Sequence, residues 1–268
     1  MSNNKWLSLD LRYGCSWHSS NKEKKQTEKI LLAALKIEHS EPDGPFANYY
    51  KHYLCRKAYE YAKNVKRERW IETERYIKKY PTLAYLYSKY VIQGRWIQAE
   101  KYIATSADSA RLYAQYVMKK PWKKAEEILF VDFNDDLSDY QPEIRQVQNL
   151  HESYYYIKNV TKKRNSKFEK LLIELSNQPR NTRFSRVPKL AYNYCRFMIK
   201  GRFEEIENLL VDSRYNKEYS ELLSPNEKEE FTNKVIMNGI EHGDEKISPF
   251  EMSYDYGIKW VKDYCAQI

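Results

Sequence analysis

The segment 58–77 reads AYEYAKNVKRERWIETERYI, and it recurs as AYLYSKYVIQGRWIQAEKYI at 84–103 and as ARLYAQYVMKKPWKKAEEIL at 110–129. From Ala58 to Ala84 to Ala110 the period is 26 residues. Equivalent positions hold the tyrosines Tyr61, Tyr87 and Tyr113, the tryptophans Trp70, Trp96 and Trp122, and the glutamates Glu74, Glu100 and Glu126. Self-similarity at a fixed period of this length predicts a repeat architecture.

Two further copies follow. The segment 191–210, AYNYCRFMIKGRFEEIENLL, places Tyr194, Phe203 and Glu207 at the same positions. A weaker copy, SYYYIKNV, begins at Ser153 and then departs from the pattern, with basic residues inserted before Phe168.

Each repeat is predicted to form two short helices. In the first helix Ala, Tyr and Val stand at relative positions 0, 3 and 7, which fall on one helical face. Pro81 suits a helix start, whereas Gly94 and Gly201 are expected to end first helices as C-terminal caps. The second helix is expected to begin at the Arg-Trp step, where the third repeat has Pro121.

A helix pair this short cannot close its own core, so neighbouring repeats must stack. The predicted fold is therefore all-α, an α-solenoid of two-helix repeats. Trp and Tyr at helical spacing are interpreted as packing residues. A glutamate beside them needs a partner, and we expect it to accept a hydrogen bond from a repeat tyrosine or to pair with Arg69, Arg95 or Arg202.

The predicted organisation has three parts: an N-terminal capping segment at 1–50, a repeat array at 51–215 interrupted at 131–150 and 176–190, and an acidic helical cap at 216–268. An amphipathic helix is expected at 21–38. In the C-terminal part, Ser224-Pro-Asn-Glu227 and Ser248-Pro-Phe-Glu251 resemble capping boxes that open helices to about Glu241 and about Tyr264.

Charge is unevenly distributed. The net charge is +9, with basic stretches at 51–130 and 161–203 and an acidic C-terminal end. This asymmetry indicates an anionic partner, head-to-tail self-association or only solvated helix faces. The basic loop 176–190 is the candidate anion contact, unless it is only a solvated linker. Its cations follow one another every three residues: Arg180, Arg183, Arg186 and Lys189.

Motifs for catalysis and for metal or cofactor binding are missing from the sequence. It has no glycine-rich phosphate loop, GxSxG or HExxH, and its four cysteines form no CxxC pair. We therefore expect no enzyme activity, no cofactor and no metal. No run of 18 apolar residues or signal peptide is present, which favours a cytoplasmic protein without membrane contact.

The string YSKYVIQGRWIQAEKYI at 87–103 resembles tandem repeats of uncharacterised tailed-bacteriophage proteins, with units of the form Tyr-Ala, Val-Ile, Gly-Arg-Trp, Ala-Glu and Ile. The resemblance is strong over 58–130 and moderate over 191–210. It departs at Pro121 and in the copy at Ser153. It implies a viral accessory protein in the cytoplasm of an infected bacterium, and no particular chemistry.

Three functions are compatible with these patterns. The first is a non-catalytic scaffold that binds a host protein to block or redirect it, in host takeover or in counter-defence. The alternative is a nucleic-acid-binding protein that uses the basic faces of 51–130 and 161–203. The third is a homo-oligomer in which the basic middle of one copy meets the acidic end of another.

Overall fold

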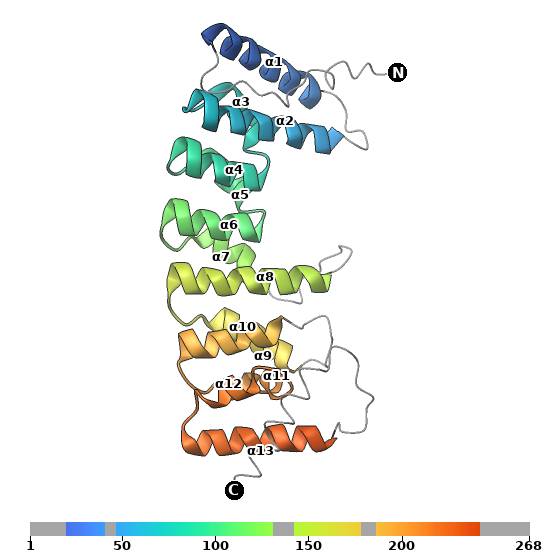
Figure 1. Cartoon of the computed structure of the whole chain (residues 1–268), viewed down its shortest axis with the longest axis vertical. Coiled ribbons are helices and arrows are strands. Elements are labelled where there is room, and N and C mark those ends of the chain that lie inside the picture. Colours follow the sequence, from blue (N-terminus) through green and yellow to red (C-terminus); the bar gives the residue numbers. More distant parts are fainter. Residues whose placement is uncertain (1–19, 41–46, 131–141, 178–185, 242–268) are drawn as a thin grey trace. The chain divides into compact units, whose positions relative to one another are not determined.

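A computed structural model describes residues 20–40, 47–130, 142–177 and 186–241. Every regular element in these ranges is a helix, which confirms the all-α prediction (Figure 1). The chain divides into two compact units, Met1–Ile128 (unit 1) and Leu129–Ile268 (unit 2). The predicted array 51–215 spans both units, and its continuity stays a prediction.

Unit 1 contains an N-terminal helix and three helix pairs. Its elements are α1 (Asn21–Ser40), α2 (Ala47–Tyr61) with η1 (Ala62–Lys66), α3 (Ile71–Ile77), α4 (Pro81–Tyr87) with η2 (Ser88–Ile92), α5 (Ile97–Ile103), α6 (Ala107–Tyr113) with η3 (Ala114–Met118), and α7 (Lys123–Leu129). The helices α2, α4 and α6 are the first helices of the three repeats, and α3, α5 and α7 are the second helices. As predicted, Pro81 opens α4.

First helices pack against one another in chain order within unit 1. α4 lies between α2 and α6, and the turns η1, η2 and η3 are neighbours in the same order (Figure 1). α1 packs on α2 and α3, burying Leu31, Ala34 and Leu35, while Ile30 on the same helix is only half-buried. The predicted helix at 21–38 is thus confirmed, and it covers the first repeat.

Each first helix ends in a widened π turn, in which an N–H bonds to the carbonyl five residues earlier, as from Arg67 to Ala62 at 2.8 Å. The next residue is left-handed although it is not glycine: φ lies between 54 and 62° at Arg67, Gln93, Lys119, Lys162 and Lys200. The prediction that Gly94 and Gly201 are the caps is wrong. The wide turn moves the left-handed position one residue earlier, and a Cβ on either glycine would meet nothing within 4 Å.

Replacing Lys119 by glycine should stabilise the protein by about 0.5–1 kcal/mol, because a Cβ is unfavourable at positive φ. The side chain of Lys119 is exposed, so little packing is lost. The measurement is chemical denaturation, with Lys119→Ala as the control that removes the charge and keeps the Cβ. Equal stability of the two variants would contradict the account of this turn.

Unit 2 is also built from helices packed in sequence. Its elements are α8 (Pro142–Tyr156) with η4 (Ile157–Thr161), α9 (Ser166–Ser176), α10 (Val187–Tyr194) with η6 (Cys195–Ile199), η7 (Glu204–Ile206), α11 (Asn208–Val211), α12 (Asn216–Ser220) and α13 (Pro225–Glu241). α10 contacts α8 and α11, and α13 covers α11 and α12. α8 and α10 begin inside the segments predicted as interruptions, whose remaining residues 131–141 and 178–185 lie outside the described ranges.

The predicted capping box at Ser224 is confirmed, since the carboxylate of Glu227 accepts hydrogen bonds from the Ser224 N–H at 2.9 Å and from its hydroxyl at 2.6 Å. The helix that it opens, α13, ends at Glu241 as predicted. The second predicted box, at Ser248, lies outside the described residues.

The copy at Ser153 keeps the register of the others, and the predicted insertion before Phe168 is wrong. Counted from Ser153, Arg164 falls at the repeat arginine, Asn165 at the tryptophan and Glu169 at the glutamate. The Asn165 side chain accepts a hydrogen bond from the Phe168 N–H at 3.0 Å and so caps α9. The Phe168 ring, centred 4.9 Å from that of Tyr194, supplies the buried aromatic group that tryptophan supplies elsewhere.

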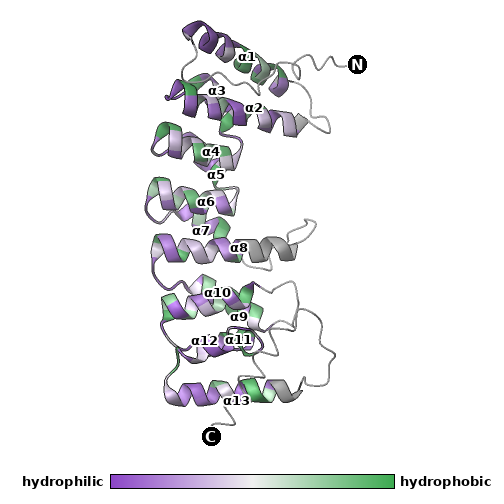
Figure 2. Cartoon of the chain, in the orientation of Figure 1, coloured by the Kyte–Doolittle hydropathy of each residue, from purple (hydrophilic) through white to green (hydrophobic). Residues whose placement is uncertain are grey.

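Described helices carry hydrophobic and hydrophilic residues mixed along their length (Figure 2). Among the described residues, no helix combines the length and apolar character needed to cross a bilayer.

Candidate binding surface

The repeat tyrosines and tryptophans pack on each other inside the repeats. Ring centroids are 5.3 Å apart for Tyr61–Trp70, 5.1 Å for Tyr87–Trp96 and 5.2 Å for Tyr113–Trp122. All six side chains are buried, as are Tyr194 and Phe203 in unit 2. The repeat aromatics therefore form the core and are not a surface for a ligand.

A tyrosine hydroxyl links each repeat to the one before it. The N–H of Trp70 donates to the hydroxyl of Tyr87 at 2.7 Å, and the N–H of Trp96 donates to that of Tyr113 at 2.8 Å. Amides at a helix start have no acceptor within their own helix, so a side chain from the next repeat satisfies them. At the N-terminal end of the array, Tyr61 instead donates to the carbonyl of Lys24 in α1 at 3.0 Å.

The same hydroxyl also contacts the repeat glutamate. Tyr113 donates to Oε1 of Glu100 at 3.3 Å, and Arg95 donates to that oxygen through Nε at 3.0 Å and Nη2 at 2.9 Å. Arg69 binds both oxygens of Glu74, each at 2.8 Å. We call this arrangement of arginine, glutamate and the tyrosine of the next repeat the relay. Glu100 thus has both partners considered from the sequence, an arginine and a repeat tyrosine.

The relay recurs in unit 2 with different aromatic groups. The Asn165 N–H donates to Tyr194 at 3.0 Å, and Tyr194 donates to Glu169 at 2.7 Å beside Arg164. A second example joins the Phe203 N–H to the hydroxyl of Tyr219 at 2.9 Å, beside Arg202 and Glu207. In the third repeat Pro121 stands at the arginine position, and Glu126 lies half-buried on α7.

Charge states in the relay follow from burial and hydrogen bonding. Burial raises the pKa of Tyr113 to about 12, the bond from Trp96 lowers it, and nearby Glu100 raises it. The hydroxyl is therefore protonated at neutral pH and can donate to the carboxylate. Burial also raises the pKa of Glu169, but hydrogen bonds from Arg164 and Tyr194 outweigh it, so the net pKa is lowered and the group is ionised.

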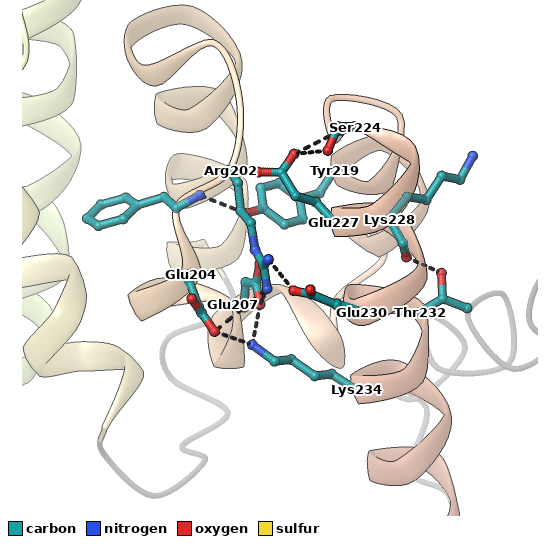
Figure 3. Close-up of polar contacts among 11 residues, drawn as sticks. Arg202, Glu204, Glu207, Tyr219, Ser224, Glu227, Lys228, Glu230, Thr232 and Lys234 are labelled. Carbon is teal, nitrogen blue, oxygen red and sulfur yellow. Dashed lines mark hydrogen bonds and ion pairs between the residues drawn. The ribbon is translucent and has the colours of Figure 1, made fainter.

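Figure 3 shows how the Arg202 relay is extended to α13. Glu230 of α13 accepts from Arg202, and Lys234 of α13 donates to Glu207 at 2.6 Å and to Glu204 at 3.3 Å. The carboxylates of Glu204, Glu207 and Glu230 are thus partly neutralised by cations within unit 2.

The predicted anion site in the basic loop lies mostly beyond the described residues. Arg180 and Arg183 fall outside them. Arg186 immediately precedes α10, and Lys189 lies in its first turn. Both side chains are exposed, whereas the neighbouring side chains of Val187 and Leu190 are buried. Residues three apart share a helix face, so Arg186 and Lys189 point to the same side.

Lysines and aromatic rings alternate on the first helices of unit 1, and we call this set the lysine–aromatic ladder. Nζ of Lys63 lies 4.4 Å from the ring centroid of Tyr90 in the next repeat, and Nζ of Lys89 lies 3.9 Å from that of Tyr116 in the repeat after it. Both distances fit cation–π contacts. Tyr90 is 43% exposed and Tyr116 is 45% exposed, so the ladder faces solvent.

Unit 2 carries an equivalent pair, because Nζ of Lys158 lies 4.4 Å from the ring centroid of Phe197, which is 39% exposed. The sequence contained the signal: Lys63, Lys89 and Lys158 each stand five residues after the first residue of a repeat, directly before the position that Tyr90, Tyr116 and Phe197 occupy in their repeats. The buried stripe of the repeats was predicted from the sequence, whereas this exposed stripe was not.

The ladder has an excess of positive charge. Residues 81–93 contain no Asp or Glu. Among the described residues, Lys63 and Lys89 form no ion pair with a carboxylate, whereas Lys66, Arg69 and Arg95 in the same unit do. Exposed aromatic groups beside unmatched cations can bind an anionic partner through both packing and charge.

The described residues contain no cluster of three or more His, Cys, Asp or Glu side chains placed to hold a metal ion. Comparisons with protein-family models, curated proteins and solved structures found no match to this chain.

Proposed function

We propose that the chain is a non-catalytic α-solenoid scaffold that binds a host protein in the cytoplasm of a phage-infected bacterium, and thereby blocks or redirects it. The repeated relays and the ordered packing of first helices in unit 1 support the solenoid. The resemblance of 58–130 to phage repeats supports the setting. Stacked repeats offer extended surfaces for binding, and function on such a scaffold depends on the exposed side chains.

The lysine–aromatic ladder is the observation that carries this proposal. Aromatic residues are enriched in protein interfaces and supply much of their binding energy. Tyr90 and Tyr116 occupy equivalent positions of consecutive repeats, and each has a lysine of the preceding repeat beside it. A partner that spans two repeats would contact both.

Affinity capture from infected bacteria tests the proposal. The full chain is compared with Tyr90→Asp/Tyr116→Asp and with Tyr49→Asp, which alters a tyrosine that is 69% exposed on α2 but outside the ladder. We expect a bacterial protein that the parent and Tyr49→Asp retain and the double variant loses. Absence of a reproducible partner would overturn the proposed function, and equal retention by all three would remove the ladder from it.

Nucleic-acid binding is the second candidate, favoured by the basic stretches 51–130 and 161–203. Such binding should weaken steeply with salt, because neutralised phosphates release counterions. Anisotropy of a labelled single-stranded oligonucleotide at low and high salt measures this directly. No binding at low salt would eliminate the candidate.

A further inference from the structure

We infer that the lysine–aromatic ladder binds an extended acidic protein segment whose carboxylates stand at alternate positions, i and i+2, and so lie on one face of the segment. This inference deepens the proposed function and rests on it, since it states which chemistry of the partner the ladder recognises.

The distance between the two lysines limits the spacing of the carboxylates that can pair with them. Nζ of Lys63 and Nζ of Lys89 lie 4.4 and 5.0 Å from the same ring centroid, that of Tyr90. The two ammonium groups are therefore at most about 10 Å apart. Side chains at positions i and i+2 of a strand-like segment point to one face, about 7 Å apart, whereas those at i and i+3 point to opposite faces. Carboxylates at positions i and i+2 can therefore reach one ammonium each.

The lysines are held in place before a partner arrives. Nζ of Lys89 donates to the hydroxyl of Tyr85 at 3.2 Å and lies 3.9 Å from the ring centroid of Tyr116. An ammonium placed against a ring still has N–H groups to donate, and its side chain loses less freedom when it forms an ion pair. Residues 81–93, which hold α4 and η2, contain no Asp or Glu, so an incoming carboxylate meets no negative side chain there.

The same geometry disfavours single-stranded nucleic acid. Bases bind such surfaces by stacking on open aromatic faces. Lysines lie over the rings of Tyr90 and Tyr116, so a base would have to displace a cation from the face on which it stacks. A carboxylate requires no such displacement.

Labelled peptides of about nine residues, two of them Glu in a Ser/Thr background, provide the probe. In the spaced isomer the glutamates stand at i and i+2 and lie on one face of an extended chain, and in the other isomer they are adjacent and lie on opposite faces, so composition and charge are equal. Two exposed ion pairs contribute a modest free energy of binding. We therefore expect the spaced isomer to bind about fivefold more tightly than the adjacent isomer at low salt.

Matched variants separate the ladder from general charge. Lys63→Met/Lys89→Met should abolish the preference for the spaced isomer. Lys101→Met/Lys124→Met removes the same charge from exposed positions on α5 and α7 and should leave the preference unchanged. Thermal melts verify that both variants fold.

Three results would overturn the inference. The isomers could bind the parent equally, the two double variants could lose equal affinity, or a single-stranded oligonucleotide could bind more tightly than the peptide through Lys63 and Lys89. If the captured host protein is retained by Lys63→Met/Lys89→Met, this inference fails while the proposed function stands. If no host protein is captured, the proposed function itself fails.

Discussion

Replacing Trp96 by alanine should lower the free energy of unfolding by about 3–5 kcal/mol, the usual loss when a large buried aromatic side chain is truncated. The Trp96 indole is buried and packs on Tyr87 at a ring-centroid distance of 5.1 Å. It lies in the middle repeat of unit 1, so neighbouring repeats on both sides restrict how far the cavity can collapse. Urea denaturation, monitored by circular dichroism, measures this free energy of unfolding.

Trp96→Phe is the control for this prediction. The chain itself has Phe203 at the equivalent position, and the Trp96 Nε1 has no hydrogen-bond partner, so phenylalanine removes no polar contact. We expect a loss below about 1.5 kcal/mol for this smaller change. If alanine cost as little as phenylalanine, the indole would not be part of the core.

Replacing Arg95 by leucine should destabilise the protein, by less than the loss of one partner of a fully buried ion pair. The side chain of Glu100 is only 6% exposed, and without Arg95 its carboxylate keeps the hydrogen bond from Tyr113 but loses its cation. Removing one partner of a buried ion pair leaves a carboxylate poorly compensated, which typically costs 3–5 kcal/mol. We expect less here because Arg95 is half-exposed and the pair is partly screened by solvent.

A double-mutant cycle with Glu100→Leu isolates this interaction. Arg95→Leu/Glu100→Leu leaves no buried charge and should be more stable than Arg95→Leu alone. Glu100→Gln tests the charge separately, since the amide oxygen can still accept from Tyr113. Additive losses in the cycle would show that Arg95 and Glu100 do not stabilise each other.

The helical repeats were predictable because their signals are side chains in a fixed register. Three features follow from the sequence: the period from Ala58 to Ala110, the burial of Trp70 and Trp96, and the start of α4 at Pro81. The relay was predictable only in part. Its arginine and glutamate are visible as side chains, but the group that donates to the tyrosine hydroxyl is a backbone N–H, which every residue except proline supplies.

The same backbone donor explains why the prediction of an insertion in the copy at Ser153 is wrong. Asn165 replaces tryptophan there, yet its N–H bonds to Tyr194 as the N–H of Trp70 bonds to Tyr87. The left-handed helix ends were missed for a similar reason. They follow from a widened turn of the backbone, and Arg67 or Lys119 carries no residue-type signal for positive φ. The ladder needed the packing of neighbouring first helices to bring Lys63 to Tyr90.

Hydrogen exchange at the backbone N–H of Trp96 tests most directly the central claim that each repeat is fastened to the next through a tyrosine hydroxyl. This amide precedes α5 and its bond is to Tyr113, so we expect strong protection in the parent protein and a selective loss of protection in Tyr113→Phe. Amides in the middle of α1 should be unaffected. Exchange of the Trp96 amide at the rate of an unstructured peptide, or at the same rate in both proteins, would contradict the account.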